Sequence, residues 1–108
     1  MTSSAEHDFL RRADECLSRL VAALDAFDPD ELEADLAGGV LKIAFADGRN
    51  CVINRQSAAQ QIWMAEGASA WHFVCQTGED WVDTKGRGPL TAILGEVISR
   101  RLGRAVRL

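Results

Sequence analysis

Apolar residues in the first third of the chain recur with the spacing of one helical face. Between residues 8 and 27 they stand mostly three or four positions apart, at Phe9, Ala13, Cys16, Leu17, Leu20, Leu24 and Phe27. A stripe of this kind on an otherwise polar segment is typical of a helix that packs one side against a core. The pattern therefore predicts an amphipathic helix over residues 8–27, the strongest helical signal in the chain.

The ends of this helix also carry recognisable signals. Ser3 or Ser4 is a suitable N-cap. Glu6 and Asp8 would then lie in the first turn, where the positive end of the helix dipole favours acids. Pro29 should stop the helix, because it has no backbone N–H and disfavours a helical conformation at the residue before it.

Between residues 32 and 83 the pattern changes to alternating apolar and polar positions, which is typical of half-buried strands. Turn signals separate the alternating segments, at Gly38-Gly39, Asp47-Gly48, Gly67 and residues 77–80. We expect five or six short strands, at residues 32–36, 41–45, 50–56, 60–65, 71–76 and 81–83. Because the connections are short, consecutive strands should pair antiparallel as a meander.

A second helical stripe begins near Pro89, a residue that is favoured in the first turn of a helix. Its apolar members are Leu90, Ile93, Leu94, Val97, Ile98 and Leu102. Gly103 should end this helix. Residues 105–108 then form a short tail that we expect to pack back on the core.

The order of elements is thus helix, five or six consecutive strands, helix. Helices that are apolar on one side only are best accommodated when both cover the same face of an antiparallel sheet. The sequence predicts an α+β fold, a two-layer α/β sandwich formed by a single domain over residues 1–108. The other face of the sheet would remain open to solvent.

Composition limits the location of the protein. No apolar run approaches the roughly 20 residues of a membrane span, and the first residues lack the basic and apolar pattern of a signal peptide. We therefore expect no membrane association and a cytoplasmic location. Cys16, Cys51 and Cys75 are odd in number and widely spaced among apolar neighbours, which indicates reduced, mostly buried thiols.

Charge is distributed unevenly along the chain. The formal net charge is −4, but ten acids against three arginines give the first 35 residues about −7, and the remainder carries about +3. Such an acidic segment disfavours nucleic acid as a partner. It favours cations or a basic protein surface instead.

The sequence lacks the residue patterns of common active sites and metal cages. There is no Cys-x-x-Cys and no pair of histidines at helical spacing, and residues 25–30 lack the glycine and final glutamate of a calcium loop. His72 and Cys75 are an odd number of positions apart in a predicted strand, so their side chains should lie on opposite faces. The sequence thus predicts no conventional catalytic centre.

The clustered acids of the first third allow two interpretations. Carboxylates are hard oxygen donors that bind ferrous, ferric or similar cations weakly, and His7 between Glu6 and Asp8 adds a nitrogen donor. Alternatively, the acids form a solvated face, and the three arginines of the same helix dilute their field.

Alternation also assigns side chains to the open face of the sheet. If Ile53, Trp71 and Phe73 point into the core, their neighbours point outward. Arg55 belongs to the core side or its rim, and the outward set is Asn54, Gln56, Gln61, Trp63 and His72. An exposed tryptophan among amides is typical of a partner anchor, unless it only covers a cross-strand neighbour or the register is shifted by one residue.

Three segments followed by the final amphipathic helix make the chain resemble the bacterial form of the frataxin family: GGVLKIAFADG at residues 38–48, CVINRQSAAQQIW at 51–63 and GEDWVD at 78–83. The most specific part is Ile53-Asn54-Arg55-Gln56 with Gln61-Ile62-Trp63. The resemblance implies the same two-layer sandwich. It also implies weak binding of iron, as Fe2+ or Fe3+, and binding to cysteine desulfurase and the scaffold of the iron–sulfur cluster assembly machinery.

By position, the resemblance assigns residues to both roles. The metal-binding set would be Asp25, Asp28, Asp30, Glu31, Glu33 and Asp35, with Glu6, His7 and Asp8 at the start of the helix. The partner-binding set would be Asn54, Gln56, Gln61, Trp63 and His72. Residues 21–24 are apolar where bacterial relatives often carry further acids, which implies a lower capacity for iron.

The function implied by the resemblance is an iron-binding regulator or iron donor of iron–sulfur cluster assembly that is not itself an enzyme. The first alternative is a protein-interaction module that regulates the desulfurase and binds iron only incidentally. The second is a ferroxidase, although the sequence shows no buried di-iron ligand set. We expect a bacterial cytoplasmic protein that is monomeric without iron, with iron-dependent oligomerisation left open.

Overall fold

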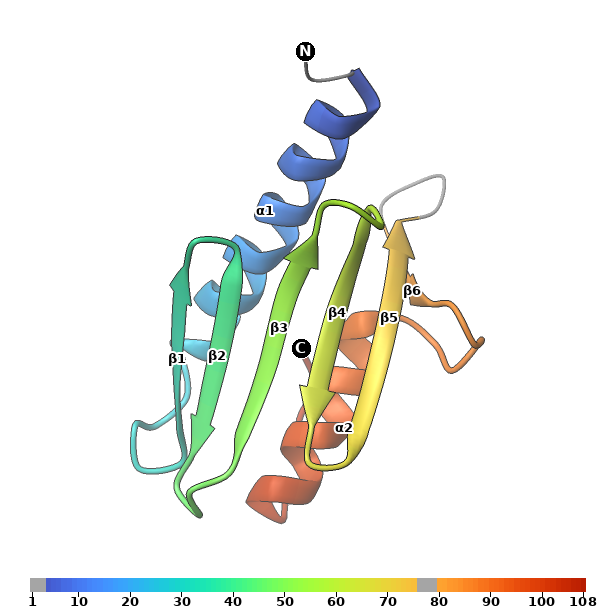
Figure 1. The fold of residues 1–108 in the computed structure, drawn as a ribbon. Helices are drawn as coiled ribbons and strands as arrows, with labels where there is room; N and C mark the ends of the chain where they lie inside the picture. Colours follow the sequence, from blue (N-terminus) through green and yellow to red (C-terminus); the bar gives the residue numbers. More distant parts are fainter. Residues whose placement is uncertain (1–3, 76–79) are drawn as a thin grey trace.

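The structure is a computed structural model that describes residues 4–75 and 80–108. Its elements follow one another as helix, six strands, helix, which confirms the predicted order (Figure 1). They are α1 (Ser4–Leu24), β1 (Leu32–Ala37), β2 (Val40–Phe45), β3 (Asn50–Gln56), β4 (Gln61–Glu66), β5 (Ser69–Cys75), β6 (Trp81–Asp83) and α2 (Leu90–Leu102).

One antiparallel sheet contains the six strands in the order of the sequence, as the meander predicts. Its register aligns Leu41 with Ile53 and Ile53 with Met64, so apolar positions of neighbouring strands share a face. Gln76 and most of the turn expected at residues 77–80 lie outside the described residues.

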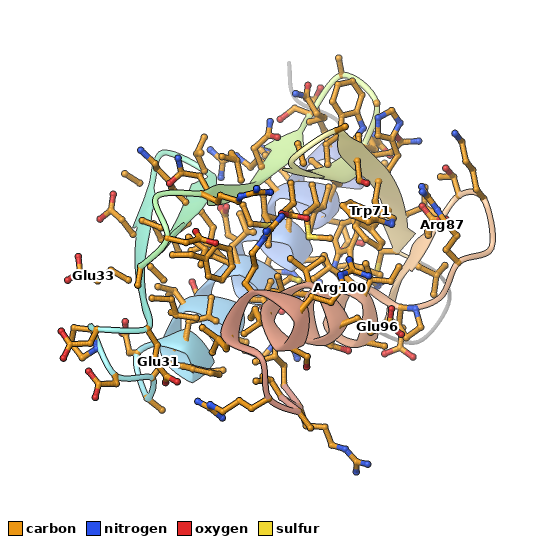
Figure 2. The ribbon with its side chains drawn as sticks, turned by 90° about the horizontal axis from the view of Figure 1, so that it is seen from below. Glu31, Glu33, Trp71, Arg87, Glu96 and Arg100 are labelled. Atoms are coloured by element: carbon orange, nitrogen blue, oxygen red, sulfur yellow. The ribbon has the colours of Figure 1, made fainter. Side chains whose placement is uncertain are left out.

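Both helices lie on one face of the sheet, and the other face is uncovered, as predicted (Figures 1 and 2). Fully buried side chains from both layers form the core between them, including Ala13, Leu17, Ile43, Ile53, Ile62, Phe73, Leu94 and Ile98. Burial of each large aliphatic or aromatic side chain stabilises the fold by about 1.5–3 kcal/mol, so this shared core decides where the helices pack.

The first turn of α1 differs slightly from the prediction. Ser4 is already helical and is therefore not a cap outside the helix, while Ser3 lies outside the described residues. Glu6 lies in the first turn as expected, whereas Asp8 lies in the second.

The end of α1 was predicted three residues too late. The helix ends at Leu24, and Phe27 lies in the following turn. The N–H groups of Ala26 and Phe27 donate to carbonyls three residues back, at 3.4 and 3.1 Å. The last turn therefore tightens before Pro29 is reached, although Phe27 still packs its ring against the core.

Helix α2 starts one residue after Pro89, which is its N-cap in an extended conformation. Gly103 ends the helix as predicted, in the left-handed region at φ 71°, and its N–H donates to the carbonyl of Ser99 at 2.9 Å. The tail turns back because the Val106 N–H donates to Ser99 Oγ at 2.8 Å, and Val106 and Leu108 pack on the core. Within the described ranges, neither helix is long and apolar enough to cross a bilayer.

Ion pairs between distant segments surround this core in the described residues. They include Arg55 with Asp14 of α1, Arg101 of α2 with Glu66 and Asp47, and Arg104 with Glu31. Arg55 therefore lies on the helix-covered face, which confirms the prediction from alternation. Glu66 is buried, and its pairing with Arg101 offsets the cost of removing a carboxylate from water.

The cysteines occupy the environments that the sequence indicates. Cys16 and Cys51 are buried, Cys75 is half-buried, and no disulfide occurs among the described residues. Burial raises the pKa of Cys16 to about 11 and that of Cys51 to about 12. Both groups therefore stay protonated and unreactive at neutral pH.

Candidate functional site

The open face of the sheet brings together the five residues that alternation assigns to it. The register aligns Asn54 with Trp63 and Trp63 with His72, so these three form one row across β3, β4 and β5. Gln56 is aligned with Gln61 two positions away on the same face. The outward orientation is thus confirmed, whereas a role of these residues in binding stays a prediction.

Trp63 is held by contacts on two sides. Its ring stacks on His72 with 4.3 Å between the ring centroids and an interplanar angle of 10°. Its Nε1–H donates to Oε1 of Gln61 at 2.8 Å. These contacts leave Trp63 half-buried although it points away from the core. The tryptophan does cover a cross-strand neighbour, but that neighbour belongs to the same candidate patch.

The row continues onto β2, where Val40 lies opposite Asn54. Val40 is 41% exposed, and no other large hydrophobic residue in the described part of the chain is classed as exposed. We call Val40, Asn54, Trp63 and His72 the Trp63 row. It contains no formally charged side chain, and its exposed apolar valine was not singled out from the sequence.

Five of the predicted metal ligands lie near the end of α1 and along β1. We call them the acidic edge: Asp25, Asp28, Asp30, Glu33 and Asp35, all exposed. Among the described residues, no basic side chain forms an ion pair with these carboxylates. Asp28 also accepts the backbone N–H of Asp30 at 2.9 Å, which fixes the turn between them. Figure 2 shows Glu33 at the β1 edge, away from Trp71 and Arg87.

Glu31, the sixth predicted ligand of this group, is engaged in an ion pair. Arg104 donates to its two carboxylate oxygens at 2.9 and 3.1 Å, and the guanidinium lies 5.6 Å from the centre of the Phe27 ring. The hydrogen bond from Arg104 lowers the pKa of Glu31. A cation would therefore have to displace Arg104 before Glu31 could bind it.

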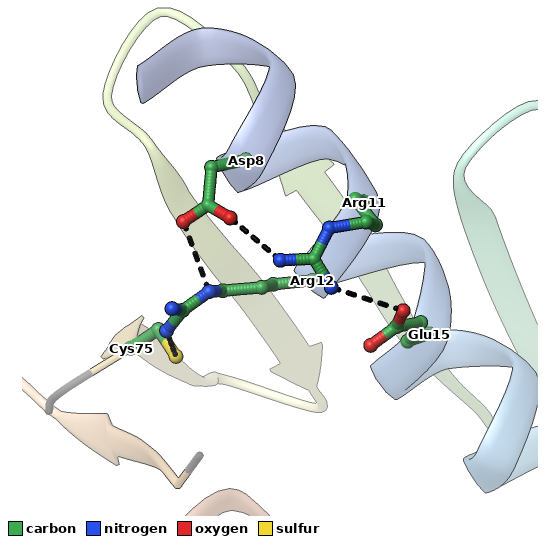
Figure 3. Close-up of polar contacts among 5 residues, drawn as sticks. All are labelled: Asp8, Arg11, Arg12, Glu15 and Cys75. Carbon is green, nitrogen blue, oxygen red and sulfur yellow. Dashed lines mark hydrogen bonds and ion pairs between the residues drawn. The ribbon is translucent and has the colours of Figure 1, made fainter. Parts of the chain in front are cut away.

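Asp8 is likewise engaged, at the other end of α1 (Figure 3). It pairs with Arg11 at 2.6 Å and with Arg12 at 3.0 Å, and Arg11 also reaches Glu15 at 3.2 Å. The side-chain hydrogen bond from Arg11 is the main cause that lowers the pKa of Asp8. Residues three or four positions apart on a helix lie side by side, so the spacing of Asp8, Arg11, Arg12 and Glu15 already indicated these ion pairs in the sequence.

The predicted ligands at the two ends of α1 do not come together. A helix rises about 1.5 Å per residue, which separates Asp8 from Asp25 by about 25 Å. Glu6, His7 and Asp8 therefore cannot share one cation with the acidic edge, and the nine predicted ligands belong to two separate regions.

The donor set at the acidic edge determines what it can hold. Within the described ranges, no three or more His, Cys, Asp or Glu side chains stand close enough to enclose a metal ion. A cation at this edge would be bound by few carboxylates, with water completing its coordination. Hard oxygen donors in this arrangement fit iron as a loosely held cargo and do not fit a permanently bound cofactor.

Sequence reasoning missed the buried carboxylate of Asp83. Its side chain is 0% exposed and accepts hydrogen bonds from the Arg87 guanidinium at 2.7 and 3.0 Å and from the N–H groups of Lys85 and Arg87 at 3.1 Å each. Arg87 also lies 5.5 Å from the centre of the Trp71 ring. The cluster organises the loop after β6, and its sequence signal was the acid placed just before a glycine-rich basic loop.

Comparisons with known proteins agree with this architecture. Residues 2–104 match the family described as the Frataxin-like domain. The iron–sulfur cluster assembly protein CyaY of Dechloromonas aromatica is 39% identical over 102 residues, which cover 94% of this chain and 95% of that protein. The protein of the same name from Cupriavidus metallidurans is 36% identical over 107 residues, with 95% of each chain covered.

Solved structures show the same fold. Frataxin from Psychromonas ingrahamii superposes with a TM-score of 0.85 at 20% identity, covering 99% of this chain and 97% of that one. Trimeric frataxin from the yeast Saccharomyces cerevisiae gives 0.75 at 28% identity, with 86% and 80% covered. Another yeast structure, described as trimeric frataxin complexed with ferrous iron, gives 0.62 at 25% identity, with 96% and 90% covered.

Two helices on one face of a six-stranded meander, with the other face open, define the two-layer sandwich that these structures share. The family match covers nearly the whole described chain, including the segments on which the resemblance was based. The chain belongs to the frataxin family.

Proposed function

We propose that the protein acts in iron–sulfur cluster assembly, as an iron-binding regulator or iron donor that docks on cysteine desulfurase. The observation that carries this proposal is its near full-length similarity to relatives named iron–sulfur cluster assembly protein, at 39% and 36% identity. Its place of action would be the bacterial cytoplasm, and it would work by binding and not by catalysis.

The acidic edge supports the iron-binding part of the proposal. Its carboxylates are exposed and unpaired within the described residues, so a cation can reach them without displacing an arginine. Few ligands at an exposed edge hold iron weakly, which suits a protein that must release it. The engagement of Glu31 and Asp8 by arginines reduces the number of available ligands below the nine that the family resemblance implies.

The Trp63 row supports the docking part of the proposal. Trp63 is a large aromatic residue on the uncovered face of the sheet, between Asn54 and His72, and exposed Val40 lies beyond Asn54 in the same row. Aromatic residues of this kind often dominate the energy of protein interfaces. The acidic edge would add attraction to a basic surface of the desulfurase or scaffold, which speeds encounter.

A second candidate function is favoured by the absence of any cluster of three possible ligands in the described part of the chain. In this alternative the protein regulates the desulfurase by docking alone, and iron binding is incidental. The same observation disfavours a ferroxidase, which needs a defined di-iron ligand set.

An anaerobic titration with ferrous iron separates these functions. The wild-type protein should bind iron, and the triple variant Asp28→Asn, Asp30→Asn, Glu33→Gln should lose most of that binding. The control variant Glu15→Gln, Asp47→Asn, Glu96→Gln changes the net charge equally and should retain it. Iron-dependent oligomerisation is followed in the same samples by light scattering.

Binding to purified cysteine desulfurase, measured with and without iron, tests the partner. If the wild-type protein docks on the desulfurase but does not bind iron in the titration, only the second candidate remains. Trp63→Ala should weaken docking by about 2 kcal/mol or more if the tryptophan is a hot spot. Oxygen-dependent iron oxidation that the triple variant abolishes would instead support the ferroxidase.

A further inference from the structure

We propose that residues 103–108, which we call the C-terminal strap, are released from the rest of the protein when a cation binds beside the acidic edge. Arg104 holds the strap on Glu31, and a ferrous ion that takes this carboxylate displaces Arg104. The inference rests on the iron binding proposed above. It adds a conformational response of the C-terminal segment to that binding.

The guanidinium of Arg104 stands where a cation would have to bind Glu31. It donates to both carboxylate oxygens, at 2.9 and 3.1 Å. Glu31 shares a turn with Asp28, because its N–H donates to the Asp28 carbonyl at 2.8 Å. The hydrogen bond from Arg104 lowers the pKa of Glu31, and the Asp28 carboxylate acts in the opposite direction, so the two carboxylates are close enough to interact. A cation that displaced Arg104 would therefore bind Glu31 beside a carboxylate of the acidic edge.

The ion pair is exposed enough for a cation to compete with it. The side chains of Arg104 and Glu31 are 51% and 32% exposed. Pairs of this kind contribute little net stability, because water and salt screen them. The second contact of Arg104, 5.6 Å from the centre of the Phe27 ring, is also made on the segment between α1 and β1. A divalent cation at Glu31 would repel the guanidinium from both contacts.

The C-terminal strap has a second anchor on α2. The N–H of Val106 donates to Ser99 Oγ at 2.8 Å, and that hydroxyl donates to the Gly95 carbonyl at 2.7 Å. Only Ala105 separates Arg104 from Val106, so the two anchors fix the same few residues. Loss of either anchor opens more conformations to the strap, which weakens the other anchor.

Release of the strap changes the surface between the helices. Val106 and Leu108 pack on the core, and Leu108 lines a hollow between α1 and α2 together with Cys16, Leu20 and Leu90. A detached strap uncovers apolar surface there. Cation binding and strap release are thus coupled, and each must change the other by the same factor. A half-exposed ion pair sets that factor at about twofold to fivefold.

Hydrogen exchange of the C-terminal peptide tests the first anchor without iron. Its amides should exchange about twofold to fivefold faster in Arg104→Ala and in Glu31→Gln than in the wild type, as measured by mass spectrometry. Arg107→Ala removes the same charge from the strap without breaking the pair and should exchange like the wild type. Equal exchange in all four proteins would overturn the anchor and the inference with it.

Ferrous iron under anaerobic conditions tests the coupling itself. Saturating iron should speed exchange of the same peptide in the wild type and in Arg107→Ala, and should add nothing in Arg104→Ala, whose strap is already released. If iron binds to the wild type without changing this exchange, the inference is wrong while iron binding stands. If the wild type binds no iron, the proposed iron-binding function fails, and the coupling fails with it.

A change at the second anchor separates this coupling from simple competition at Glu31. Ser99→Ala removes the hydroxyl that holds Val106 and leaves every charged side chain in place. It should tighten ferrous iron binding by about twofold, because a loosened strap competes less well for Glu31. Ser18→Ala removes an exposed hydroxyl of α1 and is the matched control. No gain in Ser99→Ala over this control would show that the strap takes no part in the competition.

Discussion

Individual acids in this protein differ mainly in the partner that the fold gives them. Asp83 is buried among donors, Glu31 is paired with Arg104, and Asp8 bridges Arg11 and Arg12. The residues of the acidic edge have no such ion pair within the described ranges. An acid that is already neutralised by an arginine is a poorer ligand, so fewer of the predicted acids are available to a cation than the sequence suggests.

Asp83 should be the acid whose charge stabilises the fold most. Asp83→Asn keeps the size of the side chain but removes the charge that binds Arg87. We expect it to lower the free energy of unfolding by about 2 kcal/mol at neutral pH, measured by urea unfolding. Asp35→Asn makes the same change at an exposed position and should cost less than about 0.5 kcal/mol.

The effect of Asp83 should depend on pH in a defined direction. The Arg87 hydrogen bond lowers the pKa of Asp83 below its ordinary value of 3.8. Stabilisation by the carboxylate is therefore complete above 3.8 and is lost as the pH falls through the lower pKa of the folded state. The difference between wild type and Asp83→Asn should shrink on acidification, and a constant difference would contradict this role.

Turns and helix ends decide how the elements are joined. The β1–β2 turn uses Gly38 and Gly39 at φ 57° and 78°, in the left-handed region that other residues rarely adopt. At Gly39 a Cβ would also lie 2.5 Å from Nε of Arg55, whereas at Gly38 it would meet nothing within 4 Å. The first glycine is needed for its conformation, and the second also gives space to the Arg55–Asp14 pair.

Alanine substitutions at these two glycines should therefore differ. Each should cost about 1 kcal/mol from backbone strain, and Gly39→Ala should cost up to about 1 kcal/mol more because it displaces Arg55 from Asp14. Chemical unfolding of both variants measures the difference. In an Asp14→Ala background that difference should disappear, and its persistence would show that Arg55 is not the cause.

The contact between the end of α2 and the segment before β1 should limit iron binding. Arg104→Ala releases the Glu31 carboxylate beside the acidic edge, so ferrous iron should bind more tightly in an anaerobic titration. Arg107→Ala removes the same charge without releasing Glu31 and is the matched control. Equal gains in both variants would show that net charge alone is responsible.

The molecule as a whole has two candidate binding regions, the acidic edge and the Trp63 row. The helices cover one face of the sheet (Figures 1 and 2). The Trp63 row lies on the uncovered face, across β2 to β5, and the acidic edge runs from the end of α1 into β1. In the proposed function, the cation and the partner would therefore bind at different parts of the molecule. The acidic edge also gives the molecule an uneven field that steers it toward a basic surface.

Docking on the desulfurase should weaken with salt. Screening by raising the ionic strength from about 0.05 to about 0.3 M should lower the affinity severalfold, mainly through the association rate. In the triple variant Asp28→Asn, Asp30→Asn, Glu33→Gln this dependence should be weaker, as measured by surface plasmon resonance. Trp63→Ala should lower affinity at every salt concentration without changing the slope.

The spacing of apolar residues along the sequence was sufficient to predict the order of the helices and strands. It also predicted which side of a strand the side chains discussed here occupy. Phe9 to Leu24 follow the helical period, and Ile53, Asn54, Ile62 and Trp63 follow the strand period, both of which depend on near neighbours only. The same spacing placed Trp63 and His72 on the open face. It overextended α1 to Phe27, because an apolar residue in the next turn packs on the same core as one in the helix.

Only the tertiary structure decided which charges are neutralised and what supports Trp63. Glu31 and Arg104 are 73 residues apart, and Asp14 and Arg55 are 41 apart, so no local pattern indicates their pairing. The stacking of His72 on Trp63 requires the register between β4 and β5 and compatible rotamers. The sequence thus determined a frataxin-like sandwich with an acidic first third, and packing between distant segments decided which acids and which tryptophan face remain available.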